Sequence, residues 1–234
     1  MKLLAIDTAS AQCSVALLLG EELIVREVAT SRDHARLILP MIDAVLAEAG
    51  VSLRQLQGIA FGRGPGSFTG VRVAASVTQG LALGAGLPVL PVSDLRALAA
   101  QALFRMGPPG EYLSGHVLAC MDARMGEVYW AAYGSGNGAL AADATPERVS
   151  APDQLMADFP GPCIAGAGLG LAAWPRIADS LKLTDYCFSD AEPHAREVAG
   201  LAAQDLAAGA QWLDGSQALP VYVRDQVAVA KIPI

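Results

Sequence analysis

Alternating apolar and polar blocks dominate the first part of the chain. Apolar runs over residues 2–8, 13–19 and 23–28 are bounded by short polar or glycine-containing turns, which is typical of strands. From residue 32 to 49 the apolar positions instead recur in pairs every four residues, and Gly50 follows the last pair. This spacing places an apolar stripe along a helix that ends at the glycine. The pattern predicts three strands followed by an amphipathic helix.

The next part of the chain alternates strands and helices. A short apolar run ends at a glycine-rich stretch, a helical pattern follows, and the strand–helix order is then repeated. Ser93 has the position and the hydroxyl group of an N-cap for the last of these helices. Three strands followed by this alternation predict an α/β fold, in which helices cover a mixed sheet. We expect strands over 56–61 and 88–92 and helices over 70–83 and 94–104.

A Gly-Pro-Pro-Gly sequence at 107–110 is typical of a break between structural units. Beyond it, Val117–Asp122 echoes Leu3–Asp7, because each is an apolar strand that ends in aspartate before a turn and a second strand. The echo suggests a second α/β unit, with strands over 127–133, 163–165 and 220–223 and helices over 169–177 and 193–208. We expect lobes at 1–106 and 111–234, with the final segment 213–234 packing back on the first lobe.

Charge and composition narrow the functional classes. The net charge is −7, and only three lysines are present. Nucleic-acid binding relies mainly on neutralisation of phosphates by Lys and Arg, so the chain is a poor candidate for gripping RNA by itself. The four cysteines lie far apart without a Cys-x-x-Cys pair, as in proteins of a reducing compartment. We expect a cytoplasmic protein.

Residues 73–93 carry no charge and meet the length criterion for a membrane span. However, Pro88 would end a helix near Leu87, which leaves too few residues to cross a bilayer. This segment is therefore interpreted as a buried helix followed by a buried strand, without a membrane partner.

The stretch Gly62–Arg72 contains four glycines, a proline, a serine and a threonine between a strand and a helix. It lacks the lysine of a Walker A loop and the third glycine of a dinucleotide-binding fingerprint. Two alternatives remain open. Backbone N–H groups at the helix start can favour an anion by about 0.3–1 kcal/mol. Alternatively, the glycines permit a tight turn and the hydroxyl groups cap the helix, which the residues favour.

Two aspartates end corresponding strands, Asp7 in the first unit and Asp122 in the second. Facing lobes could bring their carboxylates around a magnesium ion or a water beside a nucleotide. Alternatively, each caps its own turn through an Asx-type hydrogen bond, with Arg124 and Glu127 available to pair with Asp122. The second alternative is favoured for both residues.

The sequence gives little support for a metal site or a catalytic nucleophile. The three histidines, His34, His116 and His194, have no second ligand-type residue at helical spacing. Ser67 does not lie in a Gly-x-Ser-x-Gly elbow. No catalytic triad can be assembled from these residues.

Two helices raise the question of a protein partner. The first has an apolar stripe, and the second consists of small, uncharged residues after Arg72. A helix that is apolar on all sides is either fully buried or covered by a partner. Core packing is the usual explanation of such stripes, and a partner surface is the alternative. The candidate contact residues are Ile38, Met41, Ile42, Val45, Ala74, Val77, Thr78, Gly80 and Leu81.

With these motifs assembled, the chain resembles the TsaB (YeaZ) family, part of the bacterial machinery that makes threonylcarbamoyladenosine in tRNA. The resemblance covers nearly the whole sequence. It is carried by Leu4–Ala9, Ile38–Met41, Gly62–Arg72 continuing through Gly84, Met121–Trp130 and Pro220–Arg224.

The resemblance implies the two-lobed fold of actin-like ATPases and sugar kinases. It also implies kinship with TsaD, a transferase that holds a metal through a His-x-x-x-His pair, at positions that here are Asp94 and Leu98. Leucine cannot ligate a metal, so we expect a non-catalytic chain without a metal or cofactor. Weak nucleotide binding stays open at a degenerate phosphate site comprising Asp7, Thr8, Gly64, Gly66, Ser67, Thr69 and Asp122.

The same resemblance implies a scaffold and activating subunit. Its two first-lobe helices would bind TsaD in a heterodimer, the ATPase TsaE would join the pair, and tRNA would mainly contact other subunits. Without a partner, the apolar surface would form a homodimer. Two alternatives remain within this fold, namely an active ATPase or kinase that uses Asp7, Gly64, Gly66 and Asp122, and a metallopeptidase-like protein.

Overall fold

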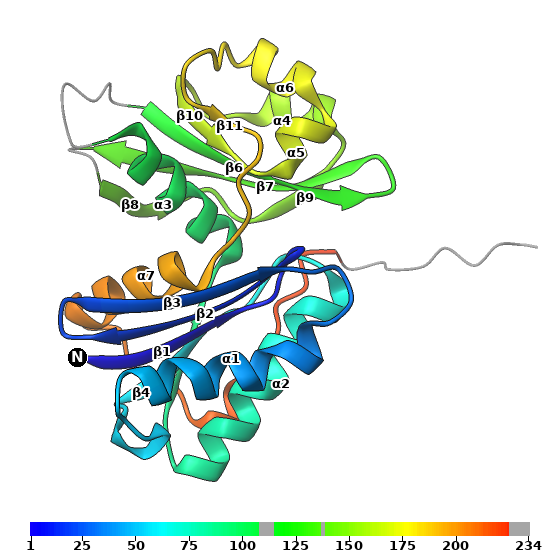
Figure 1. The fold of residues 1–234 in the computed structure, drawn as a ribbon. Coiled ribbons are helices and arrows are strands. Elements are labelled where there is room, and N and C mark those ends of the chain that lie inside the picture. The colour runs from blue at the N-terminus through cyan, green and yellow to red at the C-terminus, as the bar shows by residue number, and fades with distance from the viewer. Residues whose placement is uncertain (108–114, 137–138, 225–234) are drawn as a thin grey trace, which may run out of the picture.

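The computed structural model describes residues 1–107, 115–136 and 139–224, which form two stacked lobes (Figure 1). The first part of the chain forms β1 (Lys2–Asp7), β2 (Gln12–Leu19), β3 (Glu22–Ala29), α1 (His34–Glu48), η1 (Leu53–Gln55), β4 (Gly58–Gly62), α2 (Phe68–Ala85), β5 (Val89–Val92) and α3 (Asp94–Met106). The second part forms β6 (Gly115–Arg124), β7 (Glu127–Gly136), β8 (Ala139–Ala144), β9 (Arg148–Ser150), α4 (Pro152–Asp158), β10 (Cys163–Ala167), α5 (Leu169–Ala173), α6 (Pro175–Ser180), β11 (Cys187–Phe188), α7 (Ala195–Ala207) and η2 (Gly215–Gln217).

The two sheets share one topology. The first has the order β3-β2-β1-β4-β5, and the second has the order β8-β7-β6-β10-β11, with β9 also paired to β7. In each sheet the first three strands are antiparallel, whereas the last two run parallel to the central strand. The short echo between Leu3–Asp7 and Val117–Asp122 therefore extends to the whole sheet. This agreement supports an internal duplication.

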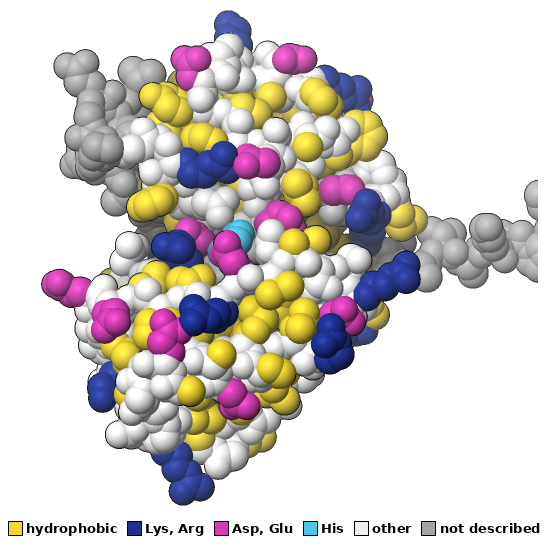
Figure 2. All heavy atoms as spheres, in the orientation of Figure 1, with side chains coloured by type: hydrophobic (Ala, Val, Ile, Leu, Met, Phe, Trp, Pro, Cys, Tyr) yellow, Lys and Arg dark blue, Asp and Glu magenta, His cyan; other side chains and the backbone are white. Residues whose placement is uncertain are grey.

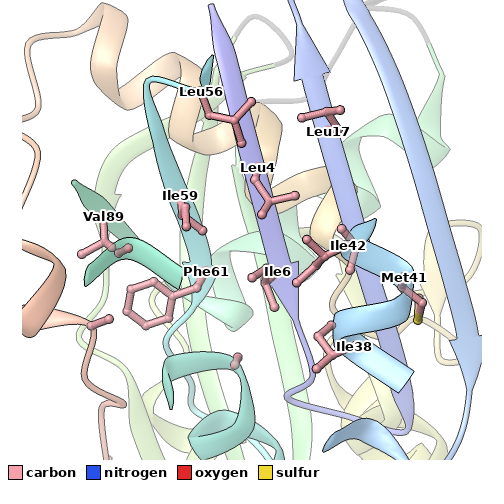
Figure 3. Packing of buried hydrophobic residues seen from close by; sticks show 14 of the residues in the cluster. Leu4, Ile6, Leu17, Ile38, Met41, Ile42, Leu56, Ile59, Phe61 and Val89 are labelled. Carbon is pink, nitrogen blue, oxygen red and sulfur yellow. The ribbon is translucent and has the colours of Figure 1, made fainter. Parts of the chain in front are cut away.

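The core of the first lobe explains the four-residue spacing in α1. Figure 3 shows Ile38 and Ile42 of this helix pointing toward the sheet, where Leu4, Ile6 and Leu17 belong to the same buried cluster. Full burial of one such aliphatic side chain contributes about 1.5–3 kcal/mol relative to exposure. The apolar stripe thus fixes α1 on the sheet.

Each lobe receives one helix from the other part of the chain. Although α3 follows β5, it packs on the second sheet, where Leu95 and Leu98 lie in one cluster with Val117. Conversely, α7 follows β11 and packs on the first sheet, where Val198 lies in one cluster with Leu3. A lobe boundary at 106–111 therefore does not follow the packing, because α3 belongs with the second sheet and α7 with the first.

The end of the described chain returns to the first lobe. Leu213 forms a two-way backbone bridge with Val89 of β5, and Gly215 packs against Ala82 and Leu83 of α2. The described part of segment 213–234 thus contacts the first lobe. The rest of this segment, 225–234, lies outside the described residues.

Two local predictions were wrong. The helix expected over 169–177 is divided into α5 and α6, because Trp174 leaves the helical conformation directly before Pro175. The run 220–223 is irregular instead of a strand, because the Val221 N–H donates to the Arg63 carbonyl of the glycine-rich loop and not to a strand. No helix within the described ranges is long and apolar enough to cross a membrane.

Candidate functional site

The glycine-rich loop packs directly against the end of β1. A Cβ atom on Gly66 would lie 2.6 Å from the Ala9 carbonyl oxygen, and one on Gly70 would overlap the Thr8 carbonyl oxygen. Only glycine allows the two backbones to approach this closely. These two glycines are therefore required by packing within the monomer.

Hydrogen bonds inside the monomer use key groups of this loop. The Ser67 N–H donates to the Ala9 carbonyl at 2.7 Å, and the Gly64 N–H donates to the Asp94 carboxylate. The Ser67 hydroxyl accepts from the Gly70 N–H at 3.4 Å and caps α2. These amides already have acceptors inside the monomer, which favours the interpretation of the loop as a tight turn with a helix cap.

The remaining residues of the predicted phosphate site have separate environments. Thr8 is buried, and its hydroxyl donates to the Gly70 carbonyl at 2.7 Å. Thr69 is exposed at the start of α2. Asp7 is fully buried, whereas Asp122 lines a cleft between the lobes. Asp122 thus shares the cleft with Gly66 and Ser67 of the predicted site, whereas Asp7 does not line it.

Each of these aspartates instead stabilises its own turn. Asp7 Oδ1 accepts the Ala9 N–H at 2.9 Å. Asp122 Oδ1 accepts the Arg124 N–H at 2.8 Å, and Asp122 Oδ2 pairs with the Arg124 guanidinium at 3.0 Å. The Asx-turn alternative therefore describes both residues. Within the described ranges, no group of three or more His, Cys, Asp or Glu residues is arranged to hold a metal ion.

The interlobe cleft has a volume of about 600 Å³ and is lined by both lobes. At its mouth, the Arg72 guanidinium stacks 3.4 Å from the centre of the Phe68 ring and donates a hydrogen bond to the Tyr222 hydroxyl at 2.7 Å. Two residues after Tyr222, Arg224 forms an ion pair with Glu127 of the second lobe. The segment around Tyr222 therefore joins the first lobe to the second across the cleft.

Sequence reasoning missed the partner of Asp7. Asp94, the first residue of α3, is fully buried, and its Oδ1 lies beside Asp7 Oδ2 around the position that a Cβ atom on Gly62 would occupy. Burial is the largest cause that raises the pKa of both carboxyl groups, and the charge of Asp7 raises the pKa of Asp94 further. In the sequence, Asp94 looks like an ordinary acidic residue of a first helical turn, so no local signal reveals this contact.

The predicted partner surface needs correction at six positions. These residues lie in the chain's own core or are otherwise buried, because the stripes of α1 and α2 face the first sheet, and they cannot contact another subunit from this position. They are Ile38, Met41, Ile42, Val45, Ala74 and Thr78. By contrast, Gly80 is exposed, and Val77 and Leu81 are partly exposed.

A different side of α2 faces solvent. We define the α2 face as Ser76, Gly80, Leu83 and Gly84, all of which are exposed and uncharged. The leucine is 60% exposed, and open space surrounds the position of a Cβ atom on either glycine. A shallow groove of about 450 Å³ lies beside the two glycines and is bordered by Leu53. Figure 2 shows hydrophobic side chains interspersed with charged ones over the lobe that carries α1 and α2.

Comparisons with known proteins agree with this architecture. A family model described as TsaD, tRNA N6-adenosine threonylcarbamoyltransferase, matches residues 24–228. The tRNA threonylcarbamoyladenosine biosynthesis protein TsaB of Escherichia coli is 38% identical over 239 residues, which cover 100% of this chain and 99% of that protein. The chain belongs to the TsaB (YeaZ) family. The TsaB protein of Haemophilus influenzae is also 38% identical, with 100% and 98% covered.

A solved structure of a family member shows the same fold. YeaZ from Pseudomonas aeruginosa superposes on this TsaB-family chain with a TM-score of 0.78 and 38% identity, covering 94% of this chain and 99% of that one. Together with the repeated sheets, this match confirms the expected two-lobed actin-like fold.

Proposed function

We propose that the chain is a non-catalytic scaffold and activating subunit in tRNA threonylcarbamoyladenosine modification. It forms a heterodimer with TsaD and recruits the ATPase TsaE, while tRNA contacts the assembly mainly through other subunits. The observation that carries the proposal is the α2 face, an exposed and uncharged helix surface that contains two glycines without a steric role in the monomer.

The glycines of this face have a cost in the free chain. A glycine inside a helix is less favourable than alanine by about 1 kcal/mol. Gly66 and Gly70 have contacts that exclude a side chain, whereas Gly80 and Gly84 have none. Small residues allow a second helix to approach to an axial distance of about 8 Å. Close packing of a partner helix across Gly80 would explain why this position has no side chain.

The positions that the family resemblance relates to the metal ligands of TsaD support a non-catalytic role. Asp94 uses one carboxylate oxygen on the Gly64 amide, and Leu98 is fully buried against the second sheet. Leucine cannot ligate a metal, so the pair of ligands that the resemblance relates to these positions is incomplete. All four cysteines are free thiols, which supports a reducing, cytoplasmic location.

The test is binding of purified TsaD to the full chain, measured by calorimetry. Gly80→Arg places a long charged side chain on the α2 face, and we expect it to weaken binding at least tenfold. Gly200→Arg is the matched control, because Gly200 is also an exposed helix glycine with open space around it, but lies on α7. This control should bind like the unmodified chain.

Thermal unfolding must show that both variants remain folded. Equal affinity of Gly80→Arg and Gly200→Arg would contradict the assignment of the α2 face. The free chain should also form homodimers through this face, and Gly80→Arg should shift it toward the monomer.

A further inference from the structure

Two carboxyl groups meet beneath the glycine-rich loop, where the chain passes from the first lobe to the second. Asp7 ends β1, and Asp94 follows β5 as the first residue of α3. Both side chains have 0% exposure. A Cβ atom on Gly62 would lie 2.8 Å from Asp7 Oδ2 and would overlap Asp94 Oδ1, so the two oxygens converge on the space left by this glycine.

The outer oxygen of each carboxyl group is used by the backbone. Asp7 Oδ1 accepts the Ala9 N–H, and Asp94 Oδ2 accepts the Gly64 N–H. The backbone N–H of Asp94 in turn donates to the Gly64 carbonyl at 3.2 Å. Asp7 Oδ2 and Asp94 Oδ1 have no hydrogen-bond partner in the described part of the chain, although they face the same space.

Two ionised carboxylates in contact would repel each other strongly in a site without solvent. A single proton between the converging oxygens removes this repulsion and satisfies both of them at once. We infer that Asp7 and Asp94 share one proton, and that this acid pair is a proton-dependent clasp between the glycine-rich loop and the start of α3. The clasp lies at the lobe junction and is independent of the proposed partner surface.

The proton resides mainly on Asp94, which donates to Asp7. Burial is the largest cause that raises the pKa of Asp94, followed by the charge of Asp7. Hydrogen bonds from Asp94 and the Ala9 amide act in the opposite direction on the pKa of Asp7. The two environments therefore differ, and Asp7 is the member that ionises first.

Other charged groups surround the pair. His194, which directly precedes α7, favours the ionised form of Asp7, and His34 of α1 does the same. Arg63 favours the ionised form of Asp94, although its guanidinium is already bound to Glu147. Glu197 of α7 adds a third, partly buried carboxyl group, whose pKa is raised chiefly by burial. Burial, and after it the charge of Asp7, raise the pKa of the Cys13 thiol.

The sign of the pH dependence follows from the raised pKa of Asp94. Its contribution to stability is complete below the ordinary aspartate value of 3.8 and is lost as pH rises through the higher pKa of the folded state. Within this window the folding equilibrium constant falls about tenfold for each pH unit.

Asp94→Asn is the decisive variant, because the amide oxygen can accept the Gly64 N–H while the amide nitrogen donates to Asp7 without titrating. In urea unfolding of the full chain, the ratio of folding constants, variant over unmodified protein, should rise at least tenfold between pH 5 and pH 7. Asp43→Asn is the control, because Asp43 is exposed on α1, and its ratio should stay constant. A constant ratio for Asp94→Asn would overturn the inference.

A second measurement uses the unmodified protein and does not depend on the folding of a variant. Infrared spectra of the chain with ¹³C-labelled aspartate should contain the C=O band of a protonated carboxyl group at pH 7. The label excludes Glu197 as its source. Absence of this band at pH 7 would overturn the shared proton.

Discussion

Arg63 and Glu147 join the two lobes through a two-pronged ion pair. The distances are 3.1 Å from Nη1 to Oε2 and 2.9 Å from Nη2 to Oε1, and the side chains are 24% and 15% exposed. Arg63 belongs to the glycine-rich loop, and its carbonyl also accepts the Val221 N–H at 2.7 Å. One residue of the loop therefore fixes both the second lobe and the returning end of the chain.

Removal of this pair should destabilise the chain more than removal of an exposed pair. Arg63→Met leaves the carboxylate of Glu147 partly buried without its partner, and we expect the free energy of unfolding to fall by about 1–2 kcal/mol. Arg176→Met is the control, because the Arg176–Asp153 pair is 52% and 71% exposed and should cost less than about 0.5 kcal/mol. Urea unfolding measures both changes. Equal losses in the free energy of unfolding would show that the interlobe pair stabilises the chain no more than an exposed pair does.

Two glycines of α2 should respond oppositely to the same substitution. In Gly70→Ala the new methyl group meets the Thr8 backbone, which cannot move aside cheaply, so stability should fall by about 1–3 kcal/mol. In Gly80→Ala the methyl group meets open space, so the gain in helix propensity should raise stability by about 0.5–1 kcal/mol.

Thermal unfolding at a concentration where the chain is monomeric provides the comparison. Gly80→Ala should also weaken binding to TsaD, because it separates two closely packed helices, although it stabilises the free chain. Gly200→Ala should give the same stabilisation without an effect on binding. A loss of stability in Gly80→Ala would mean that the glycine has a role inside the monomer.

Local patterns were sufficient to predict most of the elements. The pairs of apolar residues in α1 recur with the helix period because Ile38 and Ile42 both face the sheet. The Ser93 hydroxyl accepts the Arg96 N–H at 3.2 Å, as expected of an N-cap. Such features depend on residues a few positions apart, and the sequence contains them in full.

Features that depend on contacts between residues far apart in the sequence could not be predicted from local patterns. The exchange of α3 and α7 between the sheets follows from the packing of whole lobes. Asp7 and Asp94 are 87 positions apart, and nothing near either residue marks the other as its partner. The apolar spacing that identifies α1 also led to the wrong surface, because regularly spaced apolar residues mark the side of a helix that faces the core. The exposed face of α2 is instead marked by a lack of charged and bulky side chains.

Glycine illustrates the same limit within one helix. Gly70 is enclosed by the backbone of Thr8, and Gly80 has open space around it, yet both belong to helix α2. Only the structure separates a glycine required for folding from one that is free to serve a partner.

The most direct measurement is reconstitution of tRNA modification from purified components. The account predicts that this chain alone forms no threonylcarbamoyladenosine, that TsaD with TsaE is poorly active without it, and that adding the chain restores modification while Gly80→Arg does not. Formation of the modified nucleoside by the chain alone, or full activity of TsaD and TsaE in its absence, would contradict the account.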